Sequence, residues 1–394
     1  MRRPTKLGHV EVTSAFPTAP IGRAPVTETT PVVIRDSRTL GKVAEWTPEH
    51  ISEKLAGRTV PISVADADGA FRYDPDLASG LRFEDIPGAD LAREFRAGNR
   101  KLCLQQAPIK SQVPELLDEL TVPPFVPASK INDINLWMAS GASRTPLHYD
   151  DMHNAFAQVE GRKRFLLFNP AQFDALYPGP LNTRIESLSR VDLSRPDFQR
   201  FPKLAEVEYW EAVVGPGDLL FMPAYWWHQV SAQDVSVSVN YWWRPDVRDV
   251  LCPAFFRQLH MNMNLDDAHS LFEAFDFDGL GADRDADGGT ASLLALADLV
   301  LANGEPGAAV RVCGGIVVAA LRDRCRVLGL PSDQPVRELL DALAALADPI
   351  AADRSPARAC LTKALATRPG HPIPATEAAE LIAGLRAAAP VSSP

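Results

Sequence analysis

The stretch TPLHYDDMHNAFAQVEGRKRF, Thr145–Phe165, decides how this sequence folds and what it can bind. It places two histidines, two adjacent aspartates and a lysine among residues that otherwise alternate like β-strands. His148 and Asp150 are two positions apart, and on an extended chain such residues share one face, with Cα atoms roughly 7 Å apart. One metal ion could therefore contact both side chains.

A third metal ligand is available in MPAYWWHQV, where His228 leads into a later strand. Two histidines and one carboxylate are the donor set of non-heme Fe(II) oxygenases, which leaves coordination positions open. The HxD spacing is a weak signal by itself, and it gains specificity from a histidine 80 residues further on. The alternative is three unrelated polar residues near loops.

Lys163 supports the metal-site interpretation. Glu160-Gly161 is predicted as a hairpin turn, so the strand after it would return beside the metal ligands. A lysine inside a barrel is costly unless an anion meets it, and a dicarboxylate bound to the metal would supply that anion. Thr145 could add a hydroxyl to the same carboxylate. The alternative is that Lys163 faces solvent together with Arg162 and Arg164.

The strand pattern predicts a mainly β fold with a jelly-roll, cupin-like core. Short strands and tight turns follow one another from about residue 130, including INLWMAS, LHYD and the strands on both sides of Gly-Pro-Gly-Asp at 215–218. VSVSVNYWW alternates strictly, with Ser236, Ser238, Asn240 and Trp242 on one face and the valines on the other. Such a strand suits a barrel whose interior is polar.

The regions on either side of this core have different patterns. Residues 1–30 are rich in Pro and Thr and predict an extended arm. Mixed α/β elements follow: strands at PVVIRD and LCLQQAPI, two short strands within TVPISVADADGAFRYD, and a helix at WTPEHISEKLAG with Thr47 as its N-cap. We therefore expect an arm (1–30), a β-barrel domain (31–246) and a C-terminal helical region (247–394).

The C-terminal region predicts amphipathic helices at VRELLDALAALAD, SPARACLTKALAT and ATEAAELIAGLRAA. The segment CGGIVVAALRDRCRVLGL (313–330) is too apolar to stand alone in water. Its apolar side must bury itself against the barrel, against other helices or against a second copy of the chain.

Composition excludes some partners. The net charge of −10 argues against nucleic acid as the main partner, because phosphate binding needs clustered cations. No apolar run approaches the ~20 residues that span a bilayer. The five cysteines include no CxxC pair, which fits reduced thiols. We expect a cytoplasmic protein with neither a membrane nor a nucleic-acid partner.

Three segments resemble the JmjC (cupin-8) family. They are TPLHYDDMHNAFAQVEGRKRFLLFNPAQFDALYP, VVGPGDLLFMPAYWWHQV and VSVNYWW. Within that family the sequence looks most like asparaginyl hydroxylases of the factor-inhibiting-HIF type. The likeness runs from about Pro31 to Trp243. It implies a double-stranded β-helix, a catalytic Fe(II), 2-oxoglutarate as co-substrate, and dioxygen.

The resemblance also assigns roles to individual residues. It implies that His148, Asp150 and His228 are the iron ligands and catalytic centre, and that Lys163 and Thr145 hold the distal carboxylate of 2-oxoglutarate. The residues implied to line the co-substrate pocket are Asn154, Phe156, Asn240 and Trp242. On the substrate side, Gln105 matches a glutamine of the family.

Two departures from the family pattern lie near these residues. Cys103 stands where the subfamily has a tyrosine that helps to bind 2-oxoglutarate. The segment Ser187-Leu188-Ser189, expected at the substrate side, lacks the arginine and glutamine found there in the subfamily. The resemblance therefore supports the iron chemistry more strongly than it supports a particular substrate.

These observations predict a hydroxylase that acts on a C–H bond of an amino-acid side chain, in a protein or a biosynthetic peptide. Two alternatives stay open: a hydroxylase of a small metabolite, and a catalytically silent cupin-like binding protein. The resemblance further implies a homodimer through residues 250–275, with Phe255, Phe256 and Leu259 at the interface. The other arrangement is a monomer whose tail caps the barrel mouth.

Overall fold

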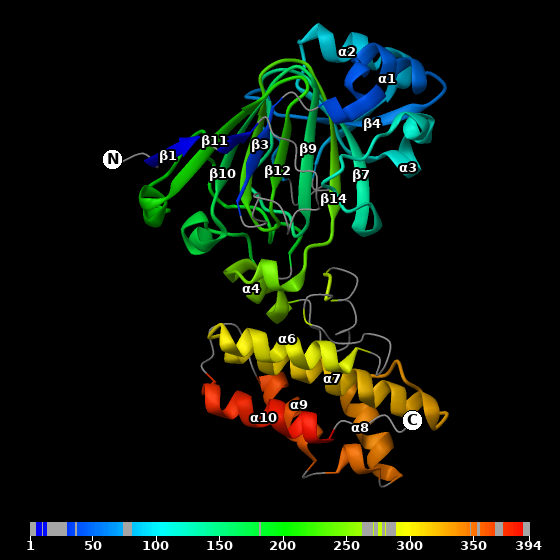
Figure 1. Ribbon diagram of the computed structural model, residues 1–394, viewed down its shortest axis with the longest axis vertical. Coiled ribbons are helices and arrows are strands. Elements are labelled where there is room, and N and C mark those ends of the chain that lie inside the picture. Colours follow the sequence, from blue (N-terminus) through cyan, green and yellow to red (C-terminus); the bar gives the residue numbers. More distant parts are fainter. Residues whose placement is uncertain are drawn as a thin grey trace. The chain divides into compact units, whose positions relative to one another are not determined.

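The computed structural model divides into two compact units, residues 1–244 and 245–394, and each is described by itself (Figure 1). The structure describes residues 5–9, 11–13, 30–35, 38–73, 81–180, 183–261, 271, 275–277, 280, 289–346, 348–352, 355–366 and 373–388. Among these residues, no helix is both long enough and apolar enough to cross a membrane.

The first unit is built on two sheets, as the jelly-roll prediction requires. In spatial order, the smaller sheet contains β1 (Thr5–His9), β11 (Glu208–Val214), β10 (Lys163–Phe168), β13 (Trp227–Ala232) and β8 (Ser143–Arg144). The larger contains β2 (Glu11–Thr13), β3 (Val32–Ile34), β12 (Leu219–Met222), β9 (His153–Glu160), β14 (Ser236–Trp243), β7 (Ile131–Ala139), β6 (Leu102–Pro108), β4 (Thr59–Val64) and β5 (Phe83–Pro87). Neighbouring strands are antiparallel except at β1–β11 and β2–β3.

The predicted hairpin at Glu160-Gly161 is wrong. β9 pairs with β12 and β14 in the larger sheet, whereas β10 pairs with β11 and β13 in the smaller one. The turn carries the chain from one sheet to the other, and a Cβ on Gly161 would lie 2.1 Å from the carbonyl oxygen of Val235. Alternation fixes the face of each side chain but leaves the pairing partner open. The Gly-Pro-Gly-Asp turn makes the same crossing between β11 and β12.

Two further strand predictions need correction. LHYD is not a strand, because only His148 within it makes isolated bridges. TVPISVADADGAFRYD supplies one strand, β4, and its hairpin partner is β5 at Phe83–Pro87. Residues 66–73 instead form a turn that lies beside Arg144. Polar interactions with other segments hold this turn, so periodicity does not reveal it.

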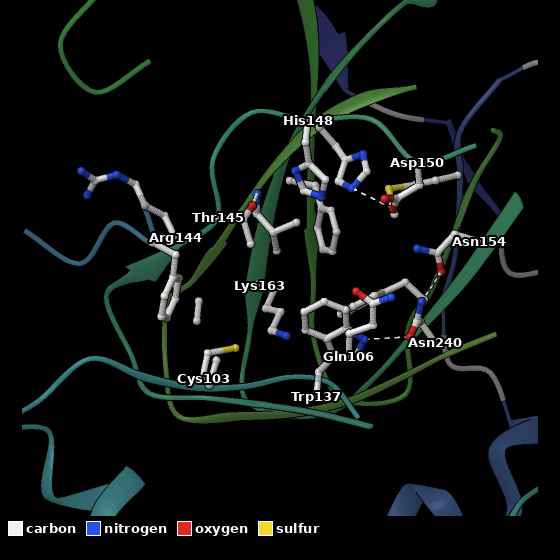
Figure 2. A pocket seen from close by; sticks show the side chains of 18 of the residues that line it. Cys103, Gln106, Trp137, Arg144, Thr145, His148, Asp150, Asn154, Lys163 and Asn240 are labelled. Atoms are coloured by element: carbon white, nitrogen blue, oxygen red, sulfur yellow. Dashed lines mark hydrogen bonds and ion pairs between the residues drawn. The ribbon is translucent and has the colours of Figure 1, made fainter. Parts of the chain in front are cut away.

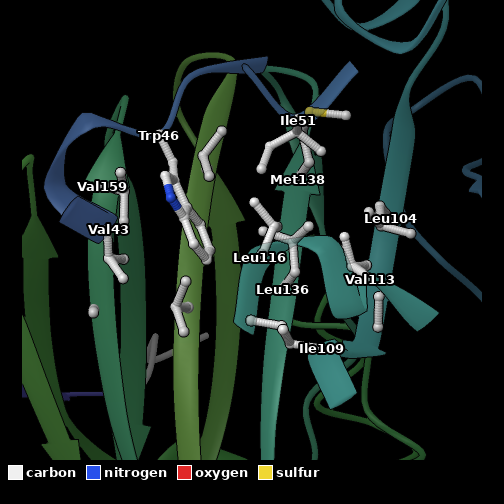
Figure 3. Packing of buried hydrophobic residues seen from close by; sticks show 14 of the residues in the cluster. Val43, Trp46, Ile51, Leu104, Ile109, Val113, Leu116, Leu136, Met138 and Val159 are labelled. Carbon is white, nitrogen blue, oxygen red and sulfur yellow. The ribbon is translucent and has the colours of Figure 1, made fainter. Parts of the chain in front are cut away.

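Helices α1 (Pro48–Lys54), α2 (Leu91–Ala97) and α3 (Ile109–Gln112) belong to the same unit. Thr47 caps α1 as predicted, its hydroxyl accepting the His50 N–H at 3.1 Å. Figure 3 shows part of the hydrophobic cluster on the outer face of the larger sheet, where Trp46 and Ile51 join Leu136 and Met138. The same cluster takes up the valines of β14, so its Ser and Asn residues point to the interior.

The expected N-terminal arm is partly built into the sheets. β1 pairs in parallel with β11, and β2 pairs in parallel with β3. Residues 14–29 of the arm lie outside the described residues.

The second unit is helical, as predicted. The described residues of this unit form α4 (Pro253–Met261), α6 (Thr290–Ala302), α7 (Pro306–Val327), α8 (Val336–Ala345), α9 (Pro356–Ala366) and α10 (Ala375–Ala388). Ser355 caps α9 through its hydroxyl, which accepts the Arg358 N–H at 3.1 Å. The apolar side of α7, including Val317 and Val318, is buried within this unit.

The three residues expected at a dimer interface are buried in the single chain. Phe255, Phe256 and Leu259 are 0%, 9% and 1% exposed, and Phe255 packs edge-on against Phe275. They are therefore core residues of the helical unit and do not form an exposed contact face. The homodimer itself stays a prediction, and residues 262–270 and 272–274 of its expected interface lie outside the described part of the chain.

Candidate metal centre

The three predicted metal ligands meet at one point. His148 and His228 face each other in an isolated antiparallel bridge, in which each backbone N–H donates to the other residue's carbonyl, at 3.0 and 2.7 Å. Their ring centroids are 4.2 Å apart. Asp150 Oδ2 lies 3.6 Å from His228 Nε2, and ligand atoms of all three residues lie within 4.8 Å of one another (Figure 2). Residues 80 positions apart are thus held together by backbone pairing.

Backbone carbonyls orient both imidazoles. His148 Nδ1 donates to the Pro146 carbonyl and His228 Nδ1 to the Trp226 carbonyl, each at 2.9 Å. Because a carbonyl can only accept, Nδ1 carries the proton and Nε2 keeps its lone pair for a ligand. Burial, reinforced by the nearby His148, lowers the pKa of His228 to about 3, so its ring is neutral at pH 7. Burial raises the pKa of Asp150.

The donor set fits divalent iron. Two imidazoles with Nε2 available and one carboxylate, their ligand atoms within 4.8 Å of one another, match the ligands of non-heme Fe(II) sites. Burial makes the Asp150 carboxylate costly to ionise, and a cation bound beside it would stabilise its charged form.

A cavity of about 150 Å³ adjoins these ligands. Besides His148, Asp150 and His228, the predicted residues that line it are Cys103, Thr145, Asn154, Phe156, Lys163, Asn240 and Trp242. Further lining residues that were not predicted are Phe71, Gln106, Trp137, Arg144 and Phe165. Most of these come from strands or loops whose pairing partners the sequence does not reveal.

Lys163 lies inside this cavity and does not face solvent. It is 4% exposed, whereas the neighbouring Arg162 and Arg164 pair with Asp234 and Glu211 at 2.8 and 3.1 Å. Its Nζ lies 5.0 Å from the centroid of the Phe156 ring, and no carboxylate in the described parts of the chain pairs with it. Burial lowers the pKa of Lys163 to about 8. The lysine still carries a charge at pH 7, and an anion in the cavity would compensate it.

Thr145 can donate toward this cavity. Its hydroxyl oxygen accepts the backbone N–H of Val230 at 3.0 Å, so the hydroxyl proton is available to another acceptor.

A chain of hydrogen bonds fixes the polarity of two amides in the cavity. The Trp137 indole N–H donates to Asn240 Oδ1 at 2.7 Å, and Asn240 Nδ2 faces Asn154 Oδ1 at 3.4 Å. An indole N–H can only donate, so each amide oxygen accepts and the Asn154 Nδ2 remains free to donate. Trp137 was missed because only the register of β7 against β14 shows that it lies near Asn240.

Gln106, and not Gln105, lines the cavity. The register of β6 against β7 shifts between Leu104 and Ala107, and Gln106 has a positive φ of 44°. This bulge changes which side chains face inward, and simple alternation cannot predict it. Leu188 pairs with His148 through an isolated bridge but does not line the cavity.

Cys103 does line the cavity, at the position where the subfamily has a tyrosine. It is 4% exposed, and burial raises the pKa of its thiol to about 12. The group is therefore a neutral thiol at pH 7.

Comparison with known proteins identifies the β-rich unit. A family model described as cupin-like domain matches residues 18–249, more than half of the chain. The chain is 30% identical over 203 residues to Jumonji C domain-containing protein 5 of Drosophila melanogaster, covering 50% of each chain. It is 30% identical over 200 residues to Lysine-specific demethylase 8 of Xenopus tropicalis, covering 50% of this chain and 44% of the relative.

A third relative is named for RNA. The chain is 35% identical over 140 residues to tRNA wybutosine-synthesizing protein 5 of Danio rerio, covering 36% of this chain and 41% of the relative. The expectation of no nucleic-acid partner therefore stays untested, and so does the finer likeness to asparaginyl hydroxylases. The chain spans about half the length, or less, of these relatives. The matched region contains all three predicted ligands, and the chain belongs to the cupin-like domain family.

Proposed function

We propose that this protein is an Fe(II)- and 2-oxoglutarate-dependent hydroxylase, acting on a C–H bond of an amino-acid side chain in a protein or biosynthetic peptide. One observation carries the proposal: the ligand atoms of His148, Asp150 and His228 converge beside a cavity that also encloses the Lys163 cation, which pairs with no carboxylate of the described residues. A bound Fe(II) with 2-oxoglutarate would supply the oxidising chemistry, in which dioxygen gives one atom to the substrate and one to succinate as carbon dioxide leaves.

The cavity residues would bind and orient the co-substrate. Lys163 provides the positive charge for one carboxylate, and the free hydroxyl proton of Thr145 can donate to it. The Asn154 amide, held by Asn240, offers another donor. The Phe156 and Phe165 rings pack at 5.1 Å in the wall and help to exclude water.

The residues on the substrate side of the cavity favour a neutral group of a polypeptide as the substrate. The Gln106 carboxamide lines the cavity, is exposed, and has no hydrogen-bond partner among the described residues. It can both donate to and accept from an amide. The lining contains one carboxylate, Asp150, which the metal would use, together with the cations of Lys163 and Arg144. A cationic methyl-lysine would find no unused negative charge there, which favours hydroxylation over demethylation.

The two alternatives remain distinguishable. A catalytically silent binding protein has no need of two imidazoles oriented by backbone carbonyls or of a buried lysine beside them. A small-metabolite hydroxylase would use the same metal site but would not need the exposed amide of Gln106.

The test is turnover by the purified full chain. We expect succinate to form only when Fe(II), 2-oxoglutarate and dioxygen are all present, and incubation with a proteome or with candidate peptides to yield products heavier by one oxygen atom. Absence of iron-dependent succinate would overturn the proposal. Succinate formation with oxidised small molecules but unmodified peptides would favour the metabolite alternative.

A further inference from the structure

Two loops flank the stretch that carries Thr145 and His148. On one side, Arg144 N–H donates to the Gly69 carbonyl at 2.8 Å and Phe71 N–H donates to the Arg144 carbonyl at 3.0 Å. On the other side, the segment 187–195 approaches the same stretch, where Ser189 N–H donates to the Leu147 carbonyl at 2.8 Å. Both loops therefore form part of the support of the metal and co-substrate residues.

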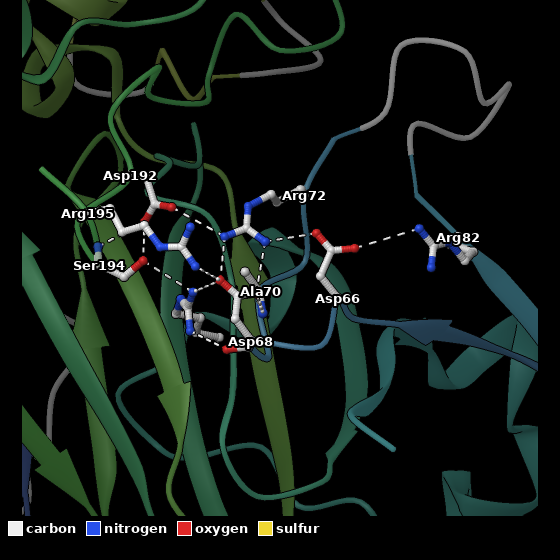
Figure 4. Close-up of polar contacts among 9 residues, drawn as sticks. Asp66, Asp68, Ala70, Arg72, Arg82, Asp192, Ser194 and Arg195 are labelled. Carbon is white, nitrogen blue, oxygen red and sulfur yellow. Dashed lines mark hydrogen bonds and ion pairs between the residues drawn. The ribbon is translucent and has the colours of Figure 1, made fainter. Parts of the chain in front are cut away.

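The Asp68 carboxylate accepts from the guanidinium groups of Arg72 and Arg144, and that of Arg195 lies 3.8 Å away (Figure 4). Arg72 binds its carboxylate through two nitrogens, at 2.8 and 2.6 Å. Arg144 contacts the same residue twice, at 2.8 Å to Oδ2 and 2.6 Å to the backbone carbonyl. Two-pronged arginine–carboxylate contacts fix geometry as well as adding energy.

The same two arginines reach the second loop. Arg72 contacts Asp192 Oδ2 at 3.3 Å, and Arg144 donates to Ser194 Oγ at 3.2 Å. Ser194 Oγ in turn donates to Asp192 Oδ1 at 2.5 Å. The network of Asp68, Arg72, Arg144, Asp192 and Ser194, which we call the clasp, thus joins the two loops across the stretch between them.

We propose that Asp68 is a positioning residue for the co-substrate site, acting through Arg144 and Arg72. The inference rests on the proposed function. Arg144 and Phe71 both line the cavity, and Thr145 follows Arg144 directly in the chain. The carboxylate of Asp68 orders Arg144 from one loop while Ser194 holds it from the other, which keeps this wall and the Thr145 hydroxyl in place.

An isolated exposed ion pair would carry little of this effect. Side-chain exposures of 41% for Arg72 and 27% for Asp68 place the pair at the surface, where single pairs contribute little to stability. The clasp differs because each arginine bridges two loops. Loss of the clasp is expected to disturb the positions of the side chains in the cavity wall more than it reduces the stability of the fold.

The test variant is Asp68→Asn, which keeps the shape and an oxygen that can accept the Ala70 N–H but removes the charge. The matched control is Glu49→Gln, because Glu49 also binds one arginine, Arg96, through two oxygens and lies outside the cavity lining. The full chain is loaded with Mn(II), and 2-oxoglutarate is titrated by calorimetry. Hydrogen–deuterium exchange of residues 187–195 is measured on the same samples.

We expect Asp68→Asn to raise the Kd for 2-oxoglutarate about three- to tenfold, with the Kd for Mn(II) within about twofold of the wild type. Residues 187–195 should exchange faster although the substitution lies on the other loop. Glu49→Gln should change neither quantity.

Unchanged co-substrate affinity, unchanged exchange, or a parallel loss of Mn(II) binding would each overturn the positioning role. Asp192→Asn breaks the other end of the clasp and should act in the same direction, which keeps the test decisive if Asp68→Asn does not fold. Failure of the wild type to bind 2-oxoglutarate would reject the proposed function instead, and the exchange data would still report whether the clasp couples the loops.

Discussion

The Trp137 indole N–H binds Oδ1 of Asn240 at 2.7 Å, and this one contact fixes the direction of the amide chain that ends at Asn154. Without a donor-only group at its start, both asparagine amides could rotate by half a turn. The oxygen of Asn154, and not its nitrogen, could then face the cavity. An oxygen there would repel a carboxylate that the nitrogen would bind.

Trp137→Phe should therefore weaken 2-oxoglutarate binding and leave a buried acceptor without its donor. We expect the free energy of unfolding to fall by about 1–3 kcal/mol for the lost partner, in addition to the cost of the smaller ring. The control is Trp242→Phe, because the Trp242 indole nitrogen is buried without a hydrogen-bond partner in the described chain. Urea denaturation would show equal losses of stability in the two variants if the indole contact is unimportant; the co-substrate affinity of Trp137→Phe is compared with the wild type alone, because Trp242 also lines the cavity.

Asp150→Ala should abolish metal-dependent turnover and leave the fold intact, because apolar side chains from both sheets pack together in the core. Wild-type protein should gain thermal stability on addition of Mn(II), since a ligand that binds only the folded state stabilises it. The variant should lose this gain. Asp151→Ala removes a neighbouring carboxylate outside the ligand cluster and should keep it. Normal consumption of 2-oxoglutarate by Asp150→Ala would disprove the ligand assignment.

Lys163→Ala should weaken 2-oxoglutarate binding by more than tenfold while metal binding persists. Loss of a charge-assisted contact in a buried site costs roughly 1.5–3 kcal/mol. Arg164→Ala is the matched control, because Arg164 is the next residue of β10 but pairs with Glu211 outside the cavity. Equal co-substrate affinity in both variants would retire the role of Lys163.

The lowered pKa of Lys163 predicts opposite effects of pH on binding and on stability. Burial holds this pKa at about 8 in the folded protein, against an ordinary value of 10.5. Affinity for 2-oxoglutarate should fall as pH rises through about 8, because the cation is lost. Between about 8 and 10.5 the unfolded chain binds more protons than the folded one, so this group makes unfolding less favourable as pH rises.

Lys163→Met isolates this effect. As pH rises from about 8 to 10.5, the free energy of unfolding of the wild type should increase relative to that of Lys163→Met. Bound 2-oxoglutarate stabilises the charged lysine and should move the window upward. A difference that does not depend on pH would show that the lysine titrates normally.

The sequence predicted the functional residues of the site better than it predicted which strands pair with each other. The HxD spacing and a distant histidine pointed to three residues whose ligand atoms the structure brings together, and strict alternation in β14 correctly placed Asn240 inside and Val239 outside. Neither signal depends on which strands are neighbours.

Features that depend on pairing were missed. The chain crosses between sheets after Glu160, and alternation is the same for a crossing strand as for a hairpin. Hydrogen bonds to Asn240 and Asp68, which are distant in sequence, position Trp137 and Arg144, respectively. The bulge in β6 moves the inward-facing position by one residue, and the sequence Gln105-Gln106 offers no clue to which glutamine is displaced.

Glycine substitution distinguishes these two glutamines without knowledge of the substrate. Gln106 has a φ of 44°, a left-handed conformation that costs a residue with a side chain about 1 kcal/mol or more and costs glycine little. Gln105 lies in β6 without a positive φ, and glycine there should cost about 0.5–1 kcal/mol through backbone entropy. We expect Gln106→Gly to leave the free energy of unfolding unchanged or to raise it, and Gln105→Gly to lower it.

The same pair separates the substrate side from the co-substrate side. Both variants should bind 2-oxoglutarate like the wild type, because neither glutamine supplies the charge or the hydroxyl proposed to hold the co-substrate. Once a peptide that gains one oxygen is found, Gln106→Gly should slow its modification, because the only exposed amide in the cavity wall of the described structure is lost, and Gln105→Gly should not. A larger loss of stability in Gln106→Gly than in Gln105→Gly would contradict the bulge. Slower peptide modification in Gln105→Gly alone would show that Gln105, and not Gln106, contacts the substrate.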